Sequence, residues 1–143
     1  MWLFTVHGYF SVVVSKEEPG KIMVRARALE HMVSLIEQIK ENIPTIYAEH
    51  HRTPDADYPH RLIMSQNDWM HVAEMLAEEI DYTNFKDEVF SVNSNRLVKW
   101  PVWLRNQYLG LLGWIWQQSQ TMSIPPTFSK PEPKKRKPNG RRR

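Results

Sequence analysis

The side chains best suited to chemistry are densest near the end of the chain. Residues 130–143 contain eight Lys or Arg and one Glu. The basic side chains singled out there are Lys134, Lys135, Arg136, Lys137, Arg141, Arg142 and Arg143. This charge density attracts phosphates whatever the base sequence, so we expect the segment to bind RNA or DNA. It is also similar to a nuclear localisation signal, which applies only in a eukaryotic host. The alternative is a tail that only keeps the protein in solution.

A second basic pair lies closer to the N-terminus. Arg25 and Arg27 are two residues apart in an alternating segment, so both project from one side of a strand. If the register of the hairpin suits, Tyr9 and Ser11 lie on that side as well. Basic and aromatic groups on a sheet face bind single-stranded nucleic acid by stacking and phosphate contact. The alternative is a solvated face whose arginines pair with neighbouring glutamates.

The loop at residues 49–60 combines three His with three carboxylates, ligand types that zinc or manganese accepts. They are Glu49, His50, His51, Asp55, Asp57 and His60. Their spacing matches no H-E-x-x-H or similar motif, so we favour a solvated loop and predict no metal or other cofactor. A small metal-dependent hydrolase or nuclease built on this loop is the alternative function.

A further polar group follows the second predicted helix. Its members are Asp81, Tyr82, Asn84 and Lys86. Short polar side chains such as Asp81 and Asn84 favour helix ends and turns, which predicts a structural role. The alternative is a pocket rim at which these residues meet Asp57, Tyr58 and Arg61.

Tryptophans are concentrated in the last predicted helix. Trp100, Trp103, Trp114 and Trp116 lie within seventeen positions, more than one helix stripe can bury. We expect Trp100 and Trp103 to pack in the core and at least one of Trp114 and Trp116 to be exposed. Trp103, Trp114 and Trp116 are therefore the residues expected at a protein interface, with a homodimer as one form of it.

Hydrophobic periodicity predicts the elements that position these groups. Alternation over 9–15 and 22–27 predicts a β-hairpin, with Trp2 to Val6 as the start of the same long strand, bent at Gly8. Spacings of three and four residues predict helices at 29–42, from Ser65 to about 80, and at 96–118. Short strands are expected at 46–48 and 61–65. Ser65, followed three residues later by Asp68, has the pattern of a helix N-cap.

These elements predict an α+β fold. We expect a small antiparallel sheet, made of the N-terminal β-hairpin plus one or two further strands, with two or three helices on one face. Residues 1–120 form a single domain in this interpretation. Residues 121–143 turn to Pro and then to charge, which predicts a disordered basic tail.

Composition narrows the classes of protein that fit. The chain of 143 residues has no Cys, so disulfides and thiolate zinc sites are excluded. No stretch approaches the roughly 18 apolar residues of a membrane span, and a reducing, cytoplasmic compartment fits best. The formal net charge of +3 is the sum of two regions of opposite charge. Residues 1–129 hold 11 basic and 15 acidic side chains, so the excess of positive charge lies in residues 130–143.

Several short motifs occur together in the first 90 residues. They are Met1-Trp2-Leu3-Phe4-Thr5, Gly8-Tyr9-Phe10-Ser11-Val12-Val13, Val24-Arg25-Ala26-Arg27, Asp57-Tyr58-Pro59-His60-Arg61 and Asp81-Tyr82-Thr83-Asn84-Phe85-Lys86. In combination they resemble a family of short bacterial and phage proteins of uncharacterised function. The resemblance implies a stand-alone cytoplasmic domain and names no activity. This chain departs from the family pattern at His60, where the family has an aromatic residue, and in its Trp-rich last helix and basic tail.

The sequence contains no Gly-rich phosphate loop, Ser-His-Asp arrangement or dinucleotide fingerprint. We therefore expect a non-enzymatic binding module, such as a phage or bacterial regulatory or accessory protein. In this interpretation the folded domain engages a protein partner while the basic tail adds affinity for nucleic acid.

Overall fold

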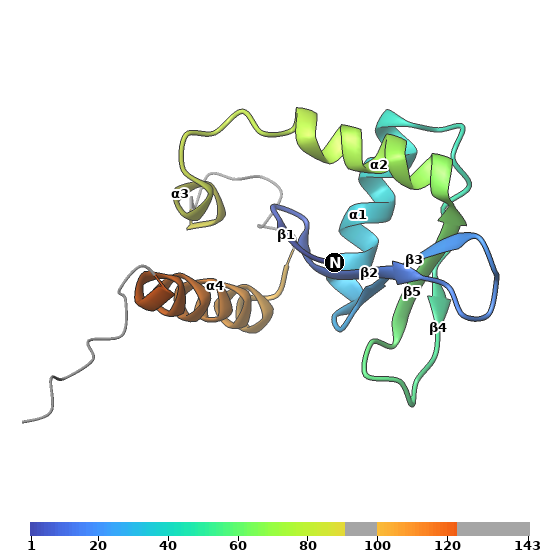
Figure 1. The fold of residues 1–143 in the computed structure, drawn as a ribbon. Helices are drawn as coiled ribbons and strands as arrows, with labels where there is room; N and C mark the ends of the chain where they lie inside the picture. The colour runs from blue at the N-terminus through green and yellow to red at the C-terminus, as the bar shows by residue number, and fades with distance from the viewer. Residues whose placement is uncertain (91–99, 123–143) are drawn as a thin grey trace, which may run out of the picture.

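The computed structural model describes residues 1–90 and 100–122. Its elements are β1 (Trp2–Thr5), β2 (Gly8–Val14), β3 (Lys21–Ala26), α1 (Leu29–Asn42), β4 (His51–Arg52), β5 (His60–Ser65), α2 (Gln66–Glu78), α3 (Phe85–Phe90) and α4 (Val102–Met122). The strands form one antiparallel sheet in the order β1-β2-β3-β5-β4 (Figure 1). The predicted α+β class is confirmed.

Helices α1 and α2 cover one face of the sheet and enclose the main core. The strands contribute alternate apolar side chains such as Phe10, Val24 and Leu62, which the pleat directs to the same face. Leu35 of α1 and Val72 of α2 pack against them. This arrangement leaves the opposite face of the sheet for other contacts.

Two helix predictions agree closely with the structure. Helix α1 has the predicted bounds of 29–42. Helix α2 begins after Ser65, whose hydroxyl accepts a hydrogen bond from the Asp68 backbone N–H at 3.0 Å. This bond satisfies one of the N–H groups that the first turn of a helix leaves unpaired.

The N-terminal segment differs from the sequence prediction. Instead of leading into β2 as one long strand, β1 is a separate strand that pairs antiparallel with β2. Gly8, at the start of β2, has a φ of +134°, and a Cβ there would lie 2.4 Å from Cγ of His31. Glycine is required because the chain must turn while passing directly against α1.

The connection between α1 and β5 also differs in detail. Residues 46–48 do not form the predicted strand, although Ile46 and Ala48 are buried in the main core. The edge strand is the two-residue β4 instead, which pairs with β5 through His51 and Arg52.

Helices α3 and α4 build a second, smaller core. Val89, Trp100, Leu104 and Tyr108 are buried together, and Phe4 and Tyr9 of the sheet pack against them. The predicted burial of Trp100 is correct, whereas Trp103 is 57% exposed. Because α4 begins at Val102 and turns Leu104 and Tyr108 inward, the neighbouring Trp103 points elsewhere.

Some predictions lie outside the described residues. The helix expected at 96–118 is α4, but Trp100 and Pro101 are not helical, so it begins later than predicted, at Val102, and ends later, at Met122. Residues 96–99 of the expected helix and the basic part of the tail lie outside the described residues. Among the described helices, none has the length and apolar character that crossing a membrane requires.

Candidate functional site

One row of side chains crosses all five strands on the sheet face opposite α1 and α2. Direct cross-strand pairing aligns Trp2, Ser11, Arg25, Arg61 and His51. Side chains at directly paired positions share a face of the sheet. Ser11 therefore lies beside Arg25, and the Arg25 Nη2 donates a hydrogen bond of 2.8 Å to its hydroxyl. The sequence predicted this contact only for a suitable register of the hairpin, and the observed register brings Ser11 and Arg25 together.

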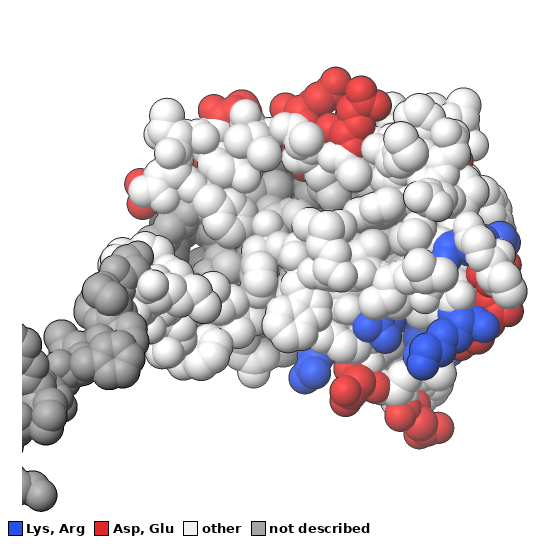
Figure 2. Space-filling view, in the orientation of Figure 1, with Lys and Arg blue, Asp and Glu red and all other residues white. Residues whose placement is uncertain are grey.

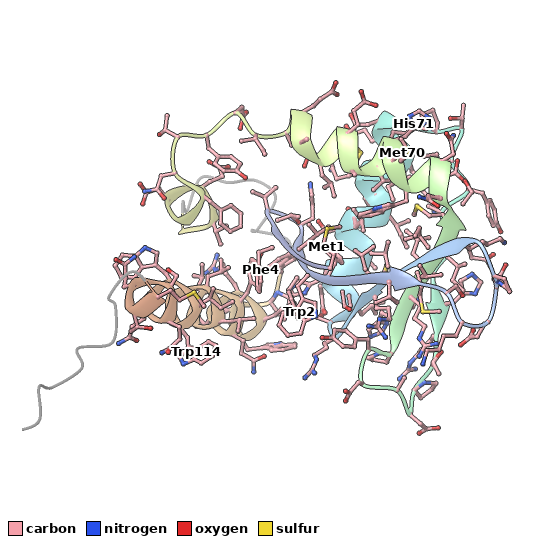
Figure 3. The ribbon with its side chains drawn as sticks, in the orientation of Figure 1. Met1, Trp2, Phe4, Met70, His71 and Trp114 are labelled. Atoms are coloured by element: carbon pink, nitrogen blue, oxygen red, sulfur yellow. The ribbon has the colours of Figure 1, made fainter. Side chains whose placement is uncertain are left out.

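A second row adds aromatic rings next to the first. Phe4 pairs with Tyr9 across β1 and β2, and their rings stack with centroids 4.7 Å apart. The Trp2 ring meets Tyr9 edge-on at 6.2 Å. Trp2 is 69% exposed, so one face of this aromatic group is open to other molecules. Figure 3 shows Trp2 and Phe4 on the part of the sheet nearest α4.

Tyr58 reaches the same face from the loop between β4 and β5. Its hydroxyl lies 3.3 Å from that of Tyr9. The guanidinium carbons of Arg25 and Arg27 each lie 4.9 Å from the centre of the Tyr58 ring. Cation–π attraction holds the ring and both arginines in one group. We call Trp2, Phe4, Tyr9, Tyr58, Arg25 and Arg27 the arginine–aromatic face.

The charge of this face is positive at neutral pH. Burial raises the pKa of Tyr9 to about 12; the Tyr58 hydroxyl adds to the shift, and Arg27 and Arg25 oppose it. Tyr9 therefore stays neutral and cancels no arginine charge. Within residues 1–90 and 100–122, neither Arg25 nor Arg27 forms an ion pair, while Arg61 pairs with Glu17 at 3.0 Å.

The surroundings of the face carry the opposite charge. Figure 2 shows Asp and Glu over α2, and Lys and Arg over the strands of the sheet with further Asp and Glu beside them. Helix α2 contains Asp68, Glu74 and Glu78 and no Lys or Arg. A polyanion approaching the folded part therefore meets repulsion over α2, and on the sheet side it meets basic side chains with carboxylates beside them.

A cavity of about 240 Å³ adjoins the arginine–aromatic face where α4 meets the hairpin. Tyr9 and Arg27 belong to both the face and the cavity wall. Trp103, Gln107 and Tyr108 of α4 line the other side. Trp103, expected at a protein interface, thus lines the same cavity as Arg27, which was expected to bind nucleic acid.

His31 of α1 closes the inner wall of this cavity. It is only 6% exposed, and its ring contacts those of Trp100 and Tyr108. Its Nδ1 accepts a hydrogen bond from the Tyr9 backbone N–H at 3.5 Å, whereas its Nε2 has no hydrogen-bond partner among the described residues. Burial lowers the pKa of His31 to about 4, so the imidazole is neutral near pH 7.

Trp114 and Trp116 lie farther along α4. Both remain exposed, at 59% and 56%, and Trp114 points outward from the helix (Figure 3). Trp116 lines a different surface cavity with Phe4 and Phe85.

The His and carboxylate side chains of the loop at 49–60 make separate contacts and do not form one cluster. His50 Nε2 and His60 Nδ1 lie 2.9 Å apart with the rings stacked, and Tyr47 donates a hydrogen bond to Glu49. Burial, with smaller effects from His50 and Arg52, lowers the pKa of His60. Residues 1–90 and 100–122 contain no group of three or more His, Asp or Glu placed to hold a metal ion.

The residues of the proposed pocket rim lie in two places. Tyr58 and Arg61 lie together, because the Arg61 Nε donates to the Tyr58 carbonyl oxygen, and Asp57 precedes them in the exposed β4–β5 loop. Asp81, Tyr82, Asn84 and Lys86 belong to the segment from α2 into α3. Figure 1 shows these two segments at different ends of the fold.

One cluster has no counterpart in the sequence motifs. His7 Nδ1 lies 3.2 Å from the Ser34 hydroxyl, and His7 Nε2 lies 2.7 Å from Glu79 Oε2. Although the residue types are those of a Ser-His-Glu triad, His7 is fully buried and Ser34 lies inside α1, where the backbone N–H groups already form helix bonds. The cluster therefore ties the β1–β2 turn to α1 and to the end of α2.

No sequence signal could have found this cluster, since its members are 27 and 72 residues apart. The approach of Tyr58 to the arginines escaped prediction for the same reason. Comparisons with protein-family models, with curated proteins and with solved structures gave no match, so the arginine–aromatic face and its cavity carry the functional argument.

Proposed function

We propose that this protein binds single-stranded nucleic acid on the arginine–aromatic face, with the basic tail adding phosphate contacts. The observation that carries the proposal is the grouping of four aromatic rings and two arginines on one sheet face. Unstacked bases bind to aromatic rings, and phosphates bind to guanidinium groups. Bases inside a duplex are stacked on each other, so the face suits a single strand.

Trp2 supplies the most accessible stacking surface. It is exposed, and its edge contact with Tyr9 holds the ring in place before a base arrives. A ring ordered in advance loses little side-chain entropy on binding. Base–aromatic stacking contributes roughly 1–3 kcal/mol per base, enough for micromolar affinity from two or three stacked bases together with phosphate contacts.

The arginines supply the phosphate contacts. Arg27 is exposed and is the main phosphate contact, because the Nε of Arg25 is buried and its Nη2 donates to Ser11. The guanidinium carbons of both arginines lie 4.9 Å from the centre of the Tyr58 ring, and a guanidinium group can make bidentate contacts with phosphate oxygens.

Fluorescence anisotropy with labelled ten-nucleotide RNA and DNA tests the proposal. We expect Trp2→Ala and Tyr58→Ala each to weaken binding about tenfold, because each removes a stacking surface. Arg27→Ala should also weaken binding and lower the slope of log K against log salt by about 0.7.

Matched controls lie away from the face. Tyr47→Ala removes an exposed aromatic ring, and Lys40→Ala removes an exposed charge from α1. Both variants should bind as the unaltered protein does. Equal binding by the face variants and the controls would refute a role for the face, and cleavage of the probe lost in His51→Ala would favour the hydrolase alternative.

A second contact is proposed for α4. We propose that Trp114 and Trp116 meet a protein partner, with a second copy of this chain as the first candidate, because two large apolar rings remain exposed on one helix. Sedimentation should show a dimer that Trp114→Ala with Trp116→Ala dissociates. A monomer at every concentration would contradict the homodimer.

The biological setting is proposed on the sequence motifs alone. Their resemblance to short bacterial and phage proteins supports a regulatory or accessory protein that acts in the cytoplasm. Identification of the gene's neighbours would test this setting independently of nucleic-acid binding.

A further inference from the structure

Helix α4 carries almost no charge although much of it is exposed. Arg105 is the single charged side chain among its 21 residues. The first half packs against the smaller core through Leu104 and Tyr108, whereas every residue from 116 to 122 is exposed. A surface helix usually presents charged side chains to water and is stabilised by packing along its other face. The exposed side of α4 instead has the composition of an interface, where charged residues are scarce.

Six exposed residues follow one line along α4, at alternating steps of four and three residues. A seven-residue repeat of this kind keeps side chains on one side of a helix and is typical of helices that pack in pairs. We call this line the α4 stripe; its members are Trp103, Gln107, Gly110, Trp114, Gln117 and Thr121. Trp103 and Trp114 lie about 20° apart around the helix axis, whereas Trp116 is about 160° from Trp114. Trp116 lies off the stripe and lines the cavity with Phe4 and Phe85.

The α4 stripe is complementary to a reversed copy of itself. In an antiparallel pair with its two-fold axis at position 112, residues equally distant from 112 face each other across the two copies. Trp114 then faces Gly110 of the second copy, and Trp103 faces Thr121. No atom of the same chain lies within 4 Å of a Cβ added at Gly110, so the space above this glycine can take an indole ring.

The polar members of the stripe also find partners in this pairing. Gln107 of one copy faces Gln117 of the other, and each amide can donate to and accept from its counterpart. The Thr121 hydroxyl already donates to the carbonyl oxygen of Gln118, which leaves its methyl group to meet Trp103 of the second copy. A parallel pair would instead place Gly110 against Gly110 and leave a gap between the helices.

The size of the stripe sets the strength of the contact. Trp103 and Trp114 each expose on the order of 100 Å², because each is more than half exposed and a tryptophan can bury up to about 250 Å². Six residues per copy bury less than the roughly 800 Å² per partner of a standard interface. A dimer held by this stripe is therefore weak, with a Kd on the order of tens of micromolar.

We propose that α4 packs antiparallel against α4 of a second copy of this chain, along the α4 stripe. The inference rests on the proposed contact of α4 with a protein partner; it names the second copy and its orientation, and it puts Trp103 in the place of Trp116. Thr121 of one copy then lies at Trp103 of the other, which lines a cavity with Arg27. The basic tail of each copy thus begins beside the arginine–aromatic face of its partner.

Sedimentation of the full-length protein over a range of micromolar concentrations tests the dimer. Trp103→Ala and Trp114→Ala should each raise the Kd of dimerisation at least about tenfold, because each removes a central aromatic contact. Gly110→Leu should keep the protein monomeric, since its side chain occupies the space of Trp114 of the second copy. The same change favours the helix itself, because leucine has a higher helix propensity than glycine, so loss of the dimer cannot be attributed to unfolding of α4.

Two matched controls lie on α4 but off the stripe. At Gly113, as at Gly110, no atom lies within 4 Å of an added Cβ, so Gly113→Leu makes the same change at another side of the helix. Trp116→Ala removes a tryptophan that is about as exposed as Trp114. Both variants should dimerise as the unaltered protein does.

Crosslinking determines the orientation, and the absence of Cys from the chain makes introduced thiols unique. A bis-maleimide of about 8 Å should join Gln107→Cys of one copy to Gln117→Cys of the other, whereas two copies of either single variant hold their thiols about 15 Å apart along the axis. The double variant should therefore form a covalent dimer and each single variant should not.

The outcomes separate this inference from the proposed function. A covalent dimer of Gln107→Cys alone would overturn the antiparallel orientation and leave the homodimer. A dimer that Trp116→Ala dissociates and Trp103→Ala does not would overturn the stripe and leave the contact through Trp114 and Trp116. A monomer at every concentration would overturn the stripe and the homodimer together, and binding of nucleic acid is measured independently of both.

Discussion

His31 shows how one buried side chain links stability to the candidate site. The same ring that borders the cavity packs against Gly8, Trp100 and Tyr108, so its ionisation affects the fold as well as any ligand. Arg27 shares the cavity wall, and burial raises the pKa of Tyr108, which therefore stays neutral.

Acid should destabilise the protein through His31. Its pKa is about 4 in the folded chain, whereas a histidine in an unfolded chain has a pKa of 6.5. Below pH 6.5, His31 of the unfolded chain binds a proton, whereas His31 of the folded chain stays neutral. Neutral His31 makes its full contribution to the free energy of unfolding above pH 6.5. This contribution is lost as the pH falls to about 4, and the loss is about 3 kcal/mol in total.

Urea unfolding at pH 7, 6, 5 and 4 measures this loss, and His31→Phe provides the reference. Carboxylates and His60 titrate in both proteins, so the difference between the two pH curves belongs to His31. Parallel curves would contradict the prediction. His60 acts in the same direction because its pKa is lowered as well.

Residue-scale prediction from sequence succeeded where neighbours in the chain determine the outcome. Ser65 caps α2 because its hydroxyl reaches an N–H three residues on. Arg25 lies in β3, whereas Arg27 follows the end of that strand, so it is their common contact with Tyr58 and not the two-residue period that groups them. Tyr58 and His31 could not be placed, because their contacts join segments whose relative position depends on the whole fold.

At the scale of elements, the junction of β1 and β2 depends on Gly8. Substitution with Ala would put a Cβ 2.4 Å from Cγ of His31 at a φ of +134°. Both the contact and the backbone conformation are unfavourable for an L side chain. We expect Gly8→Ala to lower the free energy of unfolding by about 3 kcal/mol.

Gly20 provides the matched control. Its φ is also positive, at +81°, but no atom lies within 4 Å of a Cβ added there. Gly20→Ala should therefore cost only about 1 kcal/mol, from the backbone alone. Chemical denaturation measures both variants, and equal losses would show that contact with His31 is unimportant.

Element prediction was most accurate for long periodic segments and failed where tertiary contacts replace turn residues. Helix α1 and the β2–β3 hairpin follow from their spacing. The turn between β1 and β2 lacks the usual turn sequence at Val6 and His7 and is held by the bonds of His7 to Ser34 and Glu79. Helix α3 is short and was not predicted.

At the scale of the whole molecule, charge is segregated along the chain and over the surface. Residues 1–129 carry an excess of acidic side chains, while 130–143 carry eight basic ones. The arginine–aromatic face lies on the side of the sheet away from the acidic α2 and contributes two unpaired arginines there within the described residues. Tail and face are therefore expected to share one nucleic-acid ligand.

Removal of residues 130–143 should weaken binding and reduce its dependence on salt. Up to eight phosphate contacts are lost, which lowers the slope of log K against log salt by up to about 6 for a single strand. Anisotropy at several salt concentrations measures the slope. An unchanged affinity and slope would show that the tail makes no contact with nucleic acid.

The two ends of the sheet limit how other molecules can attach. One edge is β4, only two residues long and composed of His51 and Arg52, and the other is the four-residue β1. Short edges, here one of them with a charged residue, give an incoming peptide strand few backbone groups with which to pair. β-Augmentation and edge-to-edge aggregation are therefore disfavoured at these two strands, so we expect a partner to be bound by side chains of the sheet face and not by backbone pairing.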